Sequence, residues 1–120
     1  MQVISMIVND EFGVFQRVMG EFTRKKINVE TIVVGKCELE GKARVVLTVK
    51  GRKQADQAVE RLERLHDVVT VGIVDETRHE AYALVSNDDG KARLIGSIPE
   101  VAELIESRKP DKYIHAVNAL

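Results

Sequence analysis

Apolar residues change their spacing several times along the chain, and each change predicts a new element. Residues 2–9 are a short apolar run rich in β-branched side chains, which predicts a strand. After the polar turn at 10–13, apolar residues recur every three or four positions. This spacing predicts an amphipathic helix with a buried stripe of Val14, Phe15, Val18, Met19 and Phe22. On this pattern the polar Arg17 and Glu21 face away from the core.

The next stretch predicts two strands, a helix and a further strand. The strands are expected at 28–38 and 43–50, the helix at 54–66 and the last strand at 67–74. Alternation in the second of these strands assigns one face of the sheet to Ala43, Val45, Leu47 and Val49. The order strand–helix–strand–strand–helix–strand (βαββαβ) predicts an α+β, ferredoxin-like unit, with two helices on one face of an antiparallel sheet.

The other face of that sheet is expected to stay open. It carries Val46 and apolar members of the first two strands. Because a half-apolar open face favours pairing with a second copy, we expect a homodimer.

The rest of the chain predicts a short ββαβ extension. Residues 80–86 and 91–96 form a hairpin around an Asn-Asp-Asp-Gly turn. Ser97 and Glu100 have the spacing of a capping box, and they begin a helix with a buried stripe of Ile98, Val101, Ala102 and Ile105. A last strand is expected at 112–117. We therefore divide the chain into residues 1–76 and an extension at 77–120, which is a shortened or divergent second domain.

Bulk properties narrow the function classes. The formal net charge of −1 gives no electrostatic reason to expect nucleic acid or an anionic membrane as partner. Cys37 is the only cysteine, which fits a reducing compartment, and the N-terminal residues lack the layout of a signal peptide. We therefore expect a cytoplasmic protein.

Residues with catalytic or metal-binding chemistry are scattered. His66, His79 and His115 show no ligand spacing, so no metal site is predicted. No serine lies in a nucleophile-elbow sequence and no phosphate-binding glycine pattern occurs, so we predict neither catalytic residues nor a cofactor. RNA-recognition domains share the βαββαβ order but stack bases on aromatic residues of their central strands, and no aromatic residue lies on the first or third strand here.

One candidate binding site has a physical rationale. Residues 10–13 place backbone N–H groups at a helix N-terminus, which attracts a carboxylate. Gly13 allows close approach of a ligand, and Asp10 can accept from an ammonium group. Together they suit a free α-amino acid. The alternative is an ordinary capped start of a helix after a turn.

Residues 3–71 resemble the N-terminal ACT domain of the small regulatory subunit of acetolactate synthase. The resemblance runs through ISMIVNDEFGVFQRVMGEFTRKKINVETIVVG and through VVLTVKGRKQADQAVERLERLHDVVTV. It implies feedback regulation by a branched-chain amino acid, typically valine, and association with a thiamine-diphosphate-dependent catalytic subunit. It also implies dimerisation into an eight-stranded sheet. The ligand would lie between the first loop of one protomer and the opening of the second strand of the other.

The resemblance also assigns site residues. Gly13 falls on the family's loop glycine and Asn28 on the asparagine that begins its second strand, while Asp10 replaces the usual asparagine. The full ligand-binding set implied in this way is Asp10, Phe12, Gly13, Val14, Phe15, Asn28, Val29 and Glu30. The family's small subunit continues into a second domain about as large as the first, and residues 77–120 are too few for that.

Three functions remain to be distinguished. The leading hypothesis is an amino-acid-sensing regulator that binds and controls a biosynthetic enzyme. An interaction module that dimerises without sensing would give no response to a panel of amino acids. A small enzyme would need a titratable cluster in a cleft.

Overall fold

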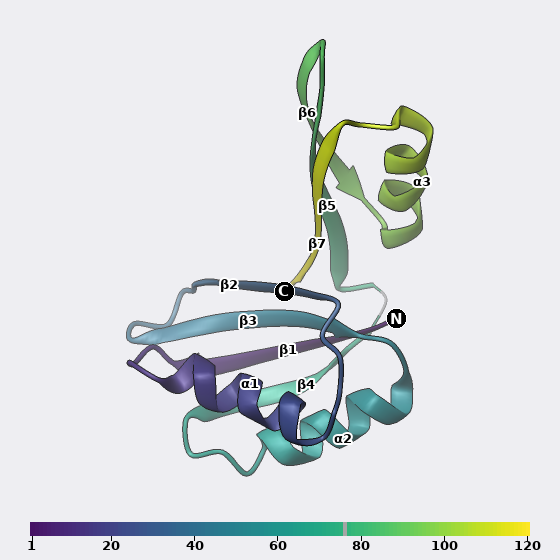
Figure 1. Cartoon of the computed structure of the whole chain (residues 1–120). Helices are drawn as coiled ribbons and strands as arrows, with labels where there is room; N and C mark the ends of the chain where they lie inside the picture. Colours follow the sequence, from purple (N-terminus) through teal and green to yellow (C-terminus); the bar gives the residue numbers. More distant parts are fainter. Residues whose placement is uncertain (76) are drawn as a thin grey trace.

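Two β-sheets, each covered by helices on one face only, make up the part of the chain that the computed structural model describes, residues 1–75 and 77–120. The second sheet stands on the uncovered face of the first (Figure 1). In chain order the elements are β1 (Gln2–Asn9), α1 (Val14–Arg24), β2 (Thr31–Lys36), β3 (Lys42–Val49), α2 (Arg52–Leu62), β4 (Val68–Val74), β5 (His79–Asn87), β6 (Gly90–Gly96), α3 (Ile98–Arg108) and β7 (Lys112–Ala119). The predicted α+β, ferredoxin-like class is confirmed.

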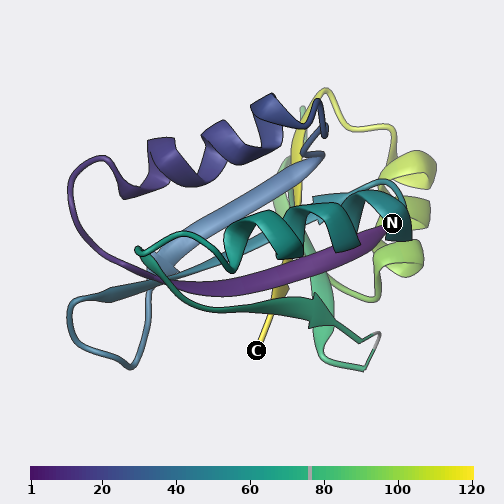
Figure 2. The same ribbon diagram turned by 90° about the horizontal axis from the view of Figure 1, so that it is seen from below.

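The first unit, β1 to β4, is an antiparallel sheet in the order β2-β3-β1-β4. Figure 2 shows α1 and α2 side by side across one face of it. The predicted alternation of β3 is confirmed, because its buried apolar side chains Ala43, Val45, Leu47 and Val49 all belong to the core beneath the helices. Ile4, Met6 and Val8 of β1 join the same core.

The buried stripe of α1 is narrower than the sequence pattern predicts. Val14, Val18 and Phe22 are buried, but the side chain of Phe15 is 46% exposed. Of the two polar residues expected to face away from the core, Arg17 is exposed as predicted, whereas the side chain of Glu21 is mostly covered. Arg17 forms an ion pair with Asp67, and Glu21, whose side chain is 11% exposed, pairs with Arg61 of α2.

Several element boundaries differ from the sequence prediction, most of all those of the second strand and the end of the second helix. The second strand is limited to Thr31–Lys36, and just before it the amide of Glu30 donates to the oxygen of Thr48 on β3. Helix α2 ends at Leu62 because the amides of Arg64 and Leu65 bond three residues back, which tightens the final turn.

The second unit, β5 to β7, repeats only part of the first. Its order β6-β5-β7 corresponds to β3-β1-β4, with a central strand antiparallel to two flanking strands that a helix connects. The first unit has α1 and β2 between its central strand β1 and β3, whereas the second unit has only the tight turn after β5. Ser97 is confirmed as the N-cap of α3, since its Oγ accepts from the Glu100 amide at 3.2 Å. The Glu100 carboxylate accepts from the Ser97 hydroxyl at 2.9 Å rather than from the Ser97 amide, so only the N-cap half of the predicted capping box forms. Ala102, placed in the buried stripe from sequence, is exposed instead.

A shared core joins the two units. Val3, Val46 and Val74, on the face of the first sheet away from its helices, pack with Val117 and Ala119 of β7. The expectation that Val46 lies on an open face available to a second copy is therefore wrong, since its side chain is 1% exposed. The covering residues belong to β7, which extends to Ala119 rather than ending at 117 as predicted.

Candidate ligand-binding loop

The connection from β1 to α1 has the backbone conformation that the sequence pattern indicates. Gly13 occupies the N-cap position of α1 with φ 85° and ψ −11°, in the left-handed region that glycine adopts readily. No side chain caps this helix, and its first turn holds no acidic residue. The positive end of the helix dipole is therefore not compensated by a side chain of the helix itself.

Three backbone hydrogen bonds hold this loop. The amide of Asn9 donates to the oxygen of Asp67, and the amide of Asp10 donates to the oxygen of Gly41, each at 2.9 Å. The Val14 amide donates to the oxygen of Glu11 at 3.2 Å. Within the described residues, the amides of Phe12, Gly13 and Phe15 donate to no other backbone group. These amides are the free donors that a carboxylate needs.

A small cavity of about 60 Å³ opens beside the loop. Asn9, Asp10 and Glu11 form its polar side. Its apolar side consists of Val8, Val14, Val18, Ala43 and Val45, with Phe15 and Val34 at the rim. The cavity thus combines an exposed carboxylate, Asp10, with a short apolar pocket.

Only part of the predicted set of ligand residues meets at this cavity. Asp10, Val14 and Phe15 line it and Gly13 adjoins them, whereas the side chain of Phe12 is 102% exposed. Asn28, Val29 and Glu30 lie at the opposite end of the sheet.

The separation follows from the registers. Asn9 pairs with Lys42 and Thr31 pairs with Thr48, both on β3. From Lys42 to Thr48 a strand rises roughly 20 Å at about 3.3 Å per residue. One chain therefore supplies the loop half of the predicted site and keeps the Asn28 half well away from it.

The edge of the sheet beside the loop is apolar and exposed. In the part of the chain that the structure describes, β2 is an edge strand paired with β3, so its outer backbone groups face away from the sheet. Phe15 is 46%, Val34 49% and Leu39 47% exposed at this edge. An unprotected apolar edge strand favours pairing with another strand.

Sequence reasoning missed two residues that hold the loop. Arg17 Nε donates to Asp67 Oδ2 at 2.7 Å, and the side chain of Asp67 is 14% exposed. Both residues were present in the segments that carry the resemblance. Their pairing needs the fold, because the two positions are 50 residues apart in sequence.

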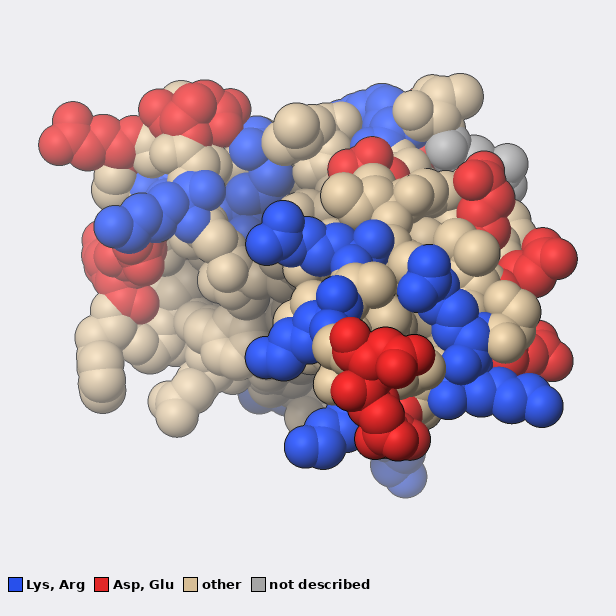
Figure 3. Space-filling model, turned by 90° about the horizontal axis from the view of Figure 1, so that it is seen from above, with Lys and Arg blue, Asp and Glu red and all other residues tan. Residues whose placement is uncertain are grey.

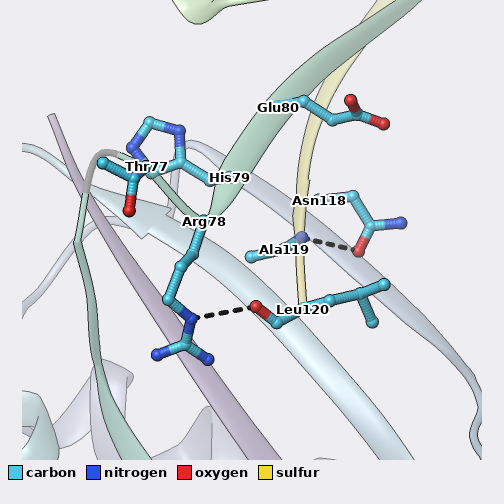
Figure 4. Close-up of a pocket in the computed structure, with 7 residues that line it drawn as sticks. All are labelled: Thr77, Arg78, His79, Glu80, Asn118, Ala119 and Leu120. Carbon is cyan, nitrogen blue, oxygen red and sulfur yellow. Dashed lines mark hydrogen bonds between the residues drawn. The ribbon is translucent and has the colours of Figure 1, made fainter.

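A second, larger hollow lies in the C-terminal unit. The cleft in Figure 4, of about 360 Å³, lies where the start of β5 meets the end of β7. Arg78 Nε donates there to the backbone oxygen of Leu120 at 3.0 Å, while His79 and Glu80, as successive strand residues, point to opposite faces. No three His, Cys, Asp or Glu side chains in the described ranges could hold a metal ion.

Charge is mixed on the face of the molecule seen in Figure 3. Figure 3 shows acidic and basic side chains interspersed around the tip of the second unit, with no face of one sign in that view. Outside the loop, Arg44 hydrogen-bonds Glu38 through both guanidinium nitrogens, at 2.9 and 3.1 Å, and this bond lowers the pKa of the Glu38 carboxyl.

Among the helices that are described, none is long and apolar enough to cross a membrane.

The βαββαβ sheet, its uncapped glycine loop and its exposed edge strand define an ACT-type unit. Comparison with known families identifies it further. Residues 4–70, more than half of the chain, match the model of AHAS small subunit-like ACT domains, and the chain belongs to that family.

Curated relatives carry the name of one enzyme. "Probable acetolactate synthase small subunit" of Methanothermobacter thermautotrophicus is 40% identical over 70 residues, and the acetolactate synthase small subunit of Bacillus subtilis is 33% identical over 72. Each match covers 58% of this chain and 42% of the relative. The chain thus matches less than half of the length of these two proteins.

Solved structures extend the likeness in fold to the second unit. The acetolactate synthase small subunit from Thermotoga maritima has a TM-score of 0.79 at 23% identity, covering 99% of this chain and 95% of that one. The regulatory subunit of aspartate kinase from Thermus thermophilus, ligand free, gives 0.59 at 14% identity and covers 90% of this chain and 89% of that one. The arrangement of β5 to β7 on the first sheet therefore has a counterpart in a solved structure.

Proposed function

We propose that this chain is a non-catalytic regulatory subunit that binds a small amino acid at a dimer interface and modulates acetolactate synthase in the cytoplasm. The observation that carries the proposal is the β1–α1 loop. It presents unpaired amides at the N-terminus of α1, an exposed Asp10 and a small apolar cavity at one place.

Each part of a zwitterionic amino acid has a matching group there. The carboxylate accepts from the free amides of Phe12, Gly13 or Phe15, where the helix dipole also favours negative charge. The ammonium group donates to Asp10. A cavity of about 60 Å³ with valine and alanine walls favours a short aliphatic side chain, such as that of valine or another branched-chain amino acid.

A side-by-side dimer would complete the site. In antiparallel pairing of two β2 edges, the start of one strand lies opposite the end of the other. Lys36, at the end of β2, pairs with Ala43 of β3, next to the Lys42 that pairs with the end of β1, so the end of β2 lies nearly level with the loop. The partner's Asn28, Val29 and Glu30 would then approach the loop of the first protomer, and Phe15 and Val34 would be covered.

The regulated enzyme is inferred from the family and the relatives' names. Small subunits of acetolactate synthase share the matched segment, so the catalytic subunit of that enzyme is the partner we propose. We assign sensing to residues 1–76 and a supporting role to residues 77–120, whose β7 covers part of the first sheet.

Thermal shift with the twenty amino acids tests the sensing role. A branched-chain amino acid should raise Tm by a degree or more, and Gly13→Asp should abolish this shift. Gly90→Asp is the matched control, because Gly90 also has a positive φ, 121°, but lies in the hairpin of the second unit. A panel without any response, together with a dimer on size exclusion, would leave the dimerisation module as the function.

A further inference from the structure

We propose that Arg17 and Asp67 form a brace that fixes the β1–α1 loop and thereby sets its affinity for the effector's carboxylate. The part that concerns the effector rests on the function proposed above. The part that concerns the loop stands on contacts within the chain.

Asp67 holds the loop from both sides. Its backbone oxygen accepts from the amide of Asn9 at 2.9 Å, where β1 ends. Its carboxylate accepts from Arg17 Nε at 2.7 Å, on the first turn of α1. One residue, placed just before β4, therefore connects to the chain before the loop and to the chain after it.

Arg17 also lies directly over the loop glycine. Its Nη1 would be 3.0 Å from a Cβ built on Gly13, and its own amide donates to the oxygen of Gly13 at 3.1 Å. Only Nε is used in the bond to Asp67. The guanidinium thus adds positive charge next to the free amides, and this favours a carboxylate there.

The brace differs from the ion pairs formed within one helix, and in linking distant segments it resembles Arg61–Glu21, whose residues are 40 positions apart. Arg52 and Asp56 pair within one helix, with side chains 68% and 60% exposed, and such pairs contribute little. The Asp67 side chain is 14% exposed and its partner is 50 residues away. Losing this bond would free the loop relative to β4 rather than weaken one helix.

Asp67 lies where the pairing of β1 with β4 is irregular, so its contacts matter more for the position of the loop. The register between β1 and β4 shifts between Ile7 and Val8, so regular pairing ends just before the loop. With the ladder interrupted there, the two contacts of Asp67 take over the alignment of the loop with β4. Arg17 and Asp67 are accordingly positioning residues.

Hydrogen exchange on the full chain, without added amino acid, tests the brace. We expect Arg17→Gln and Asp67→Asn each to accelerate exchange of the hydrogen-bonded amides within 9–16, those of Asn9, Asp10 and Val14, about five- to tenfold, without changing exchange in β5 to β7. Arg52→Gln is the matched control and should change neither. The double variant should exchange no faster than either single variant, since both remove the same bond.

A charge swap separates positioning from a general loss of stability. Arg17→Asp combined with Asp67→Arg should restore part of the protection at 9–16. Thermal-shift titration with L-valine, or with the amino acid that responds in the panel, should show about fivefold weaker binding to Arg17→Gln.

Unchanged exchange at 9–16 in both single variants would overturn the brace. Faster exchange with undiminished affinity for a ligand that the wild-type chain binds would overturn the claim that the brace sets this affinity. A wild-type chain that responds to no amino acid, while Arg17→Gln still loosens the loop, would overturn the proposed sensing function and leave the loop brace standing.

Discussion

Substituting Val46 by alanine tests the shared core between the two units. The valine side chain is 1% exposed and packs with Val3, Val74 and Val117. Removing two buried carbon groups at about 0.8 kcal/mol each, and leaving a cavity that closes incompletely, should cost about 2–3 kcal/mol of unfolding free energy. If Val46 were on an open face, the same substitution would cost little.

Urea unfolding measures this cost. Val46→Ala should lower the midpoint while the slope with denaturant stays unchanged, which indicates a loss of stability without a change in the surface exposed. Val69→Ala on β4 is the matched control: this valine is 50% exposed, so its substitution should stay within about half a kcal/mol. A loss below about 0.5 kcal/mol for Val46→Ala would refute the packing of β7 on the first sheet.

Three further outcomes follow from local contacts. Ser97→Ala removes the N-cap acceptor of α3 and should cost about 1 kcal/mol in thermal or urea unfolding. Thr48→Val should cost about 1–2 kcal/mol in the same measurement, because the fully buried Thr48 hydroxyl accepts from the amide of Thr31 at 3.1 Å. The hydrogen bond from Arg44 lowers the pKa of the Glu38 carboxyl below its ordinary value of 4.5. The ionised carboxylate therefore stabilises the fold at pH values above 4.5, and this contribution is lost as the pH falls through the lowered pKa. An NMR titration should show Glu38 protonating below 4.5, and closer to 4.5 in Arg44→Gln.

The periodicity of apolar residues along the chain was sufficient to predict the order of the helices and strands. Alternation placed Ala43 to Val49 correctly because β3 is central and its neighbours determine which face is buried. The prediction that Phe15 is buried was wrong because this residue lies at the flank of α1 beside the edge strand, where it stays 46% exposed. Hydrophobicity alone does not distinguish a flank from a core position.

Contacts between distant segments could not be predicted from the hydrophobic pattern of the sequence. Burial of Val46 depends on β7, about 70 residues later in the chain, and the pairing of Arg17 with Asp67 depends on how α2 returns to the sheet. For the site, local reasoning located the Gly13 loop, since the turn and the helix start are adjacent in sequence. The ligand-binding role proposed for Asn28, Val29 and Glu30 would depend on a second protomer, which no local pattern specifies.

The reduced topology of the second unit has a consequence for stoichiometry. Its β5 passes to β6 through the short turn at Asp88 and Asp89, at the point where the first unit has the Gly13 loop, α1 and β2. The second unit thus has neither a helix N-terminus facing a cavity at that position nor a counterpart of the β2 edge. Isothermal titration of the chain should accordingly saturate at one effector molecule per protomer, even though the chain contains two sheets of related architecture.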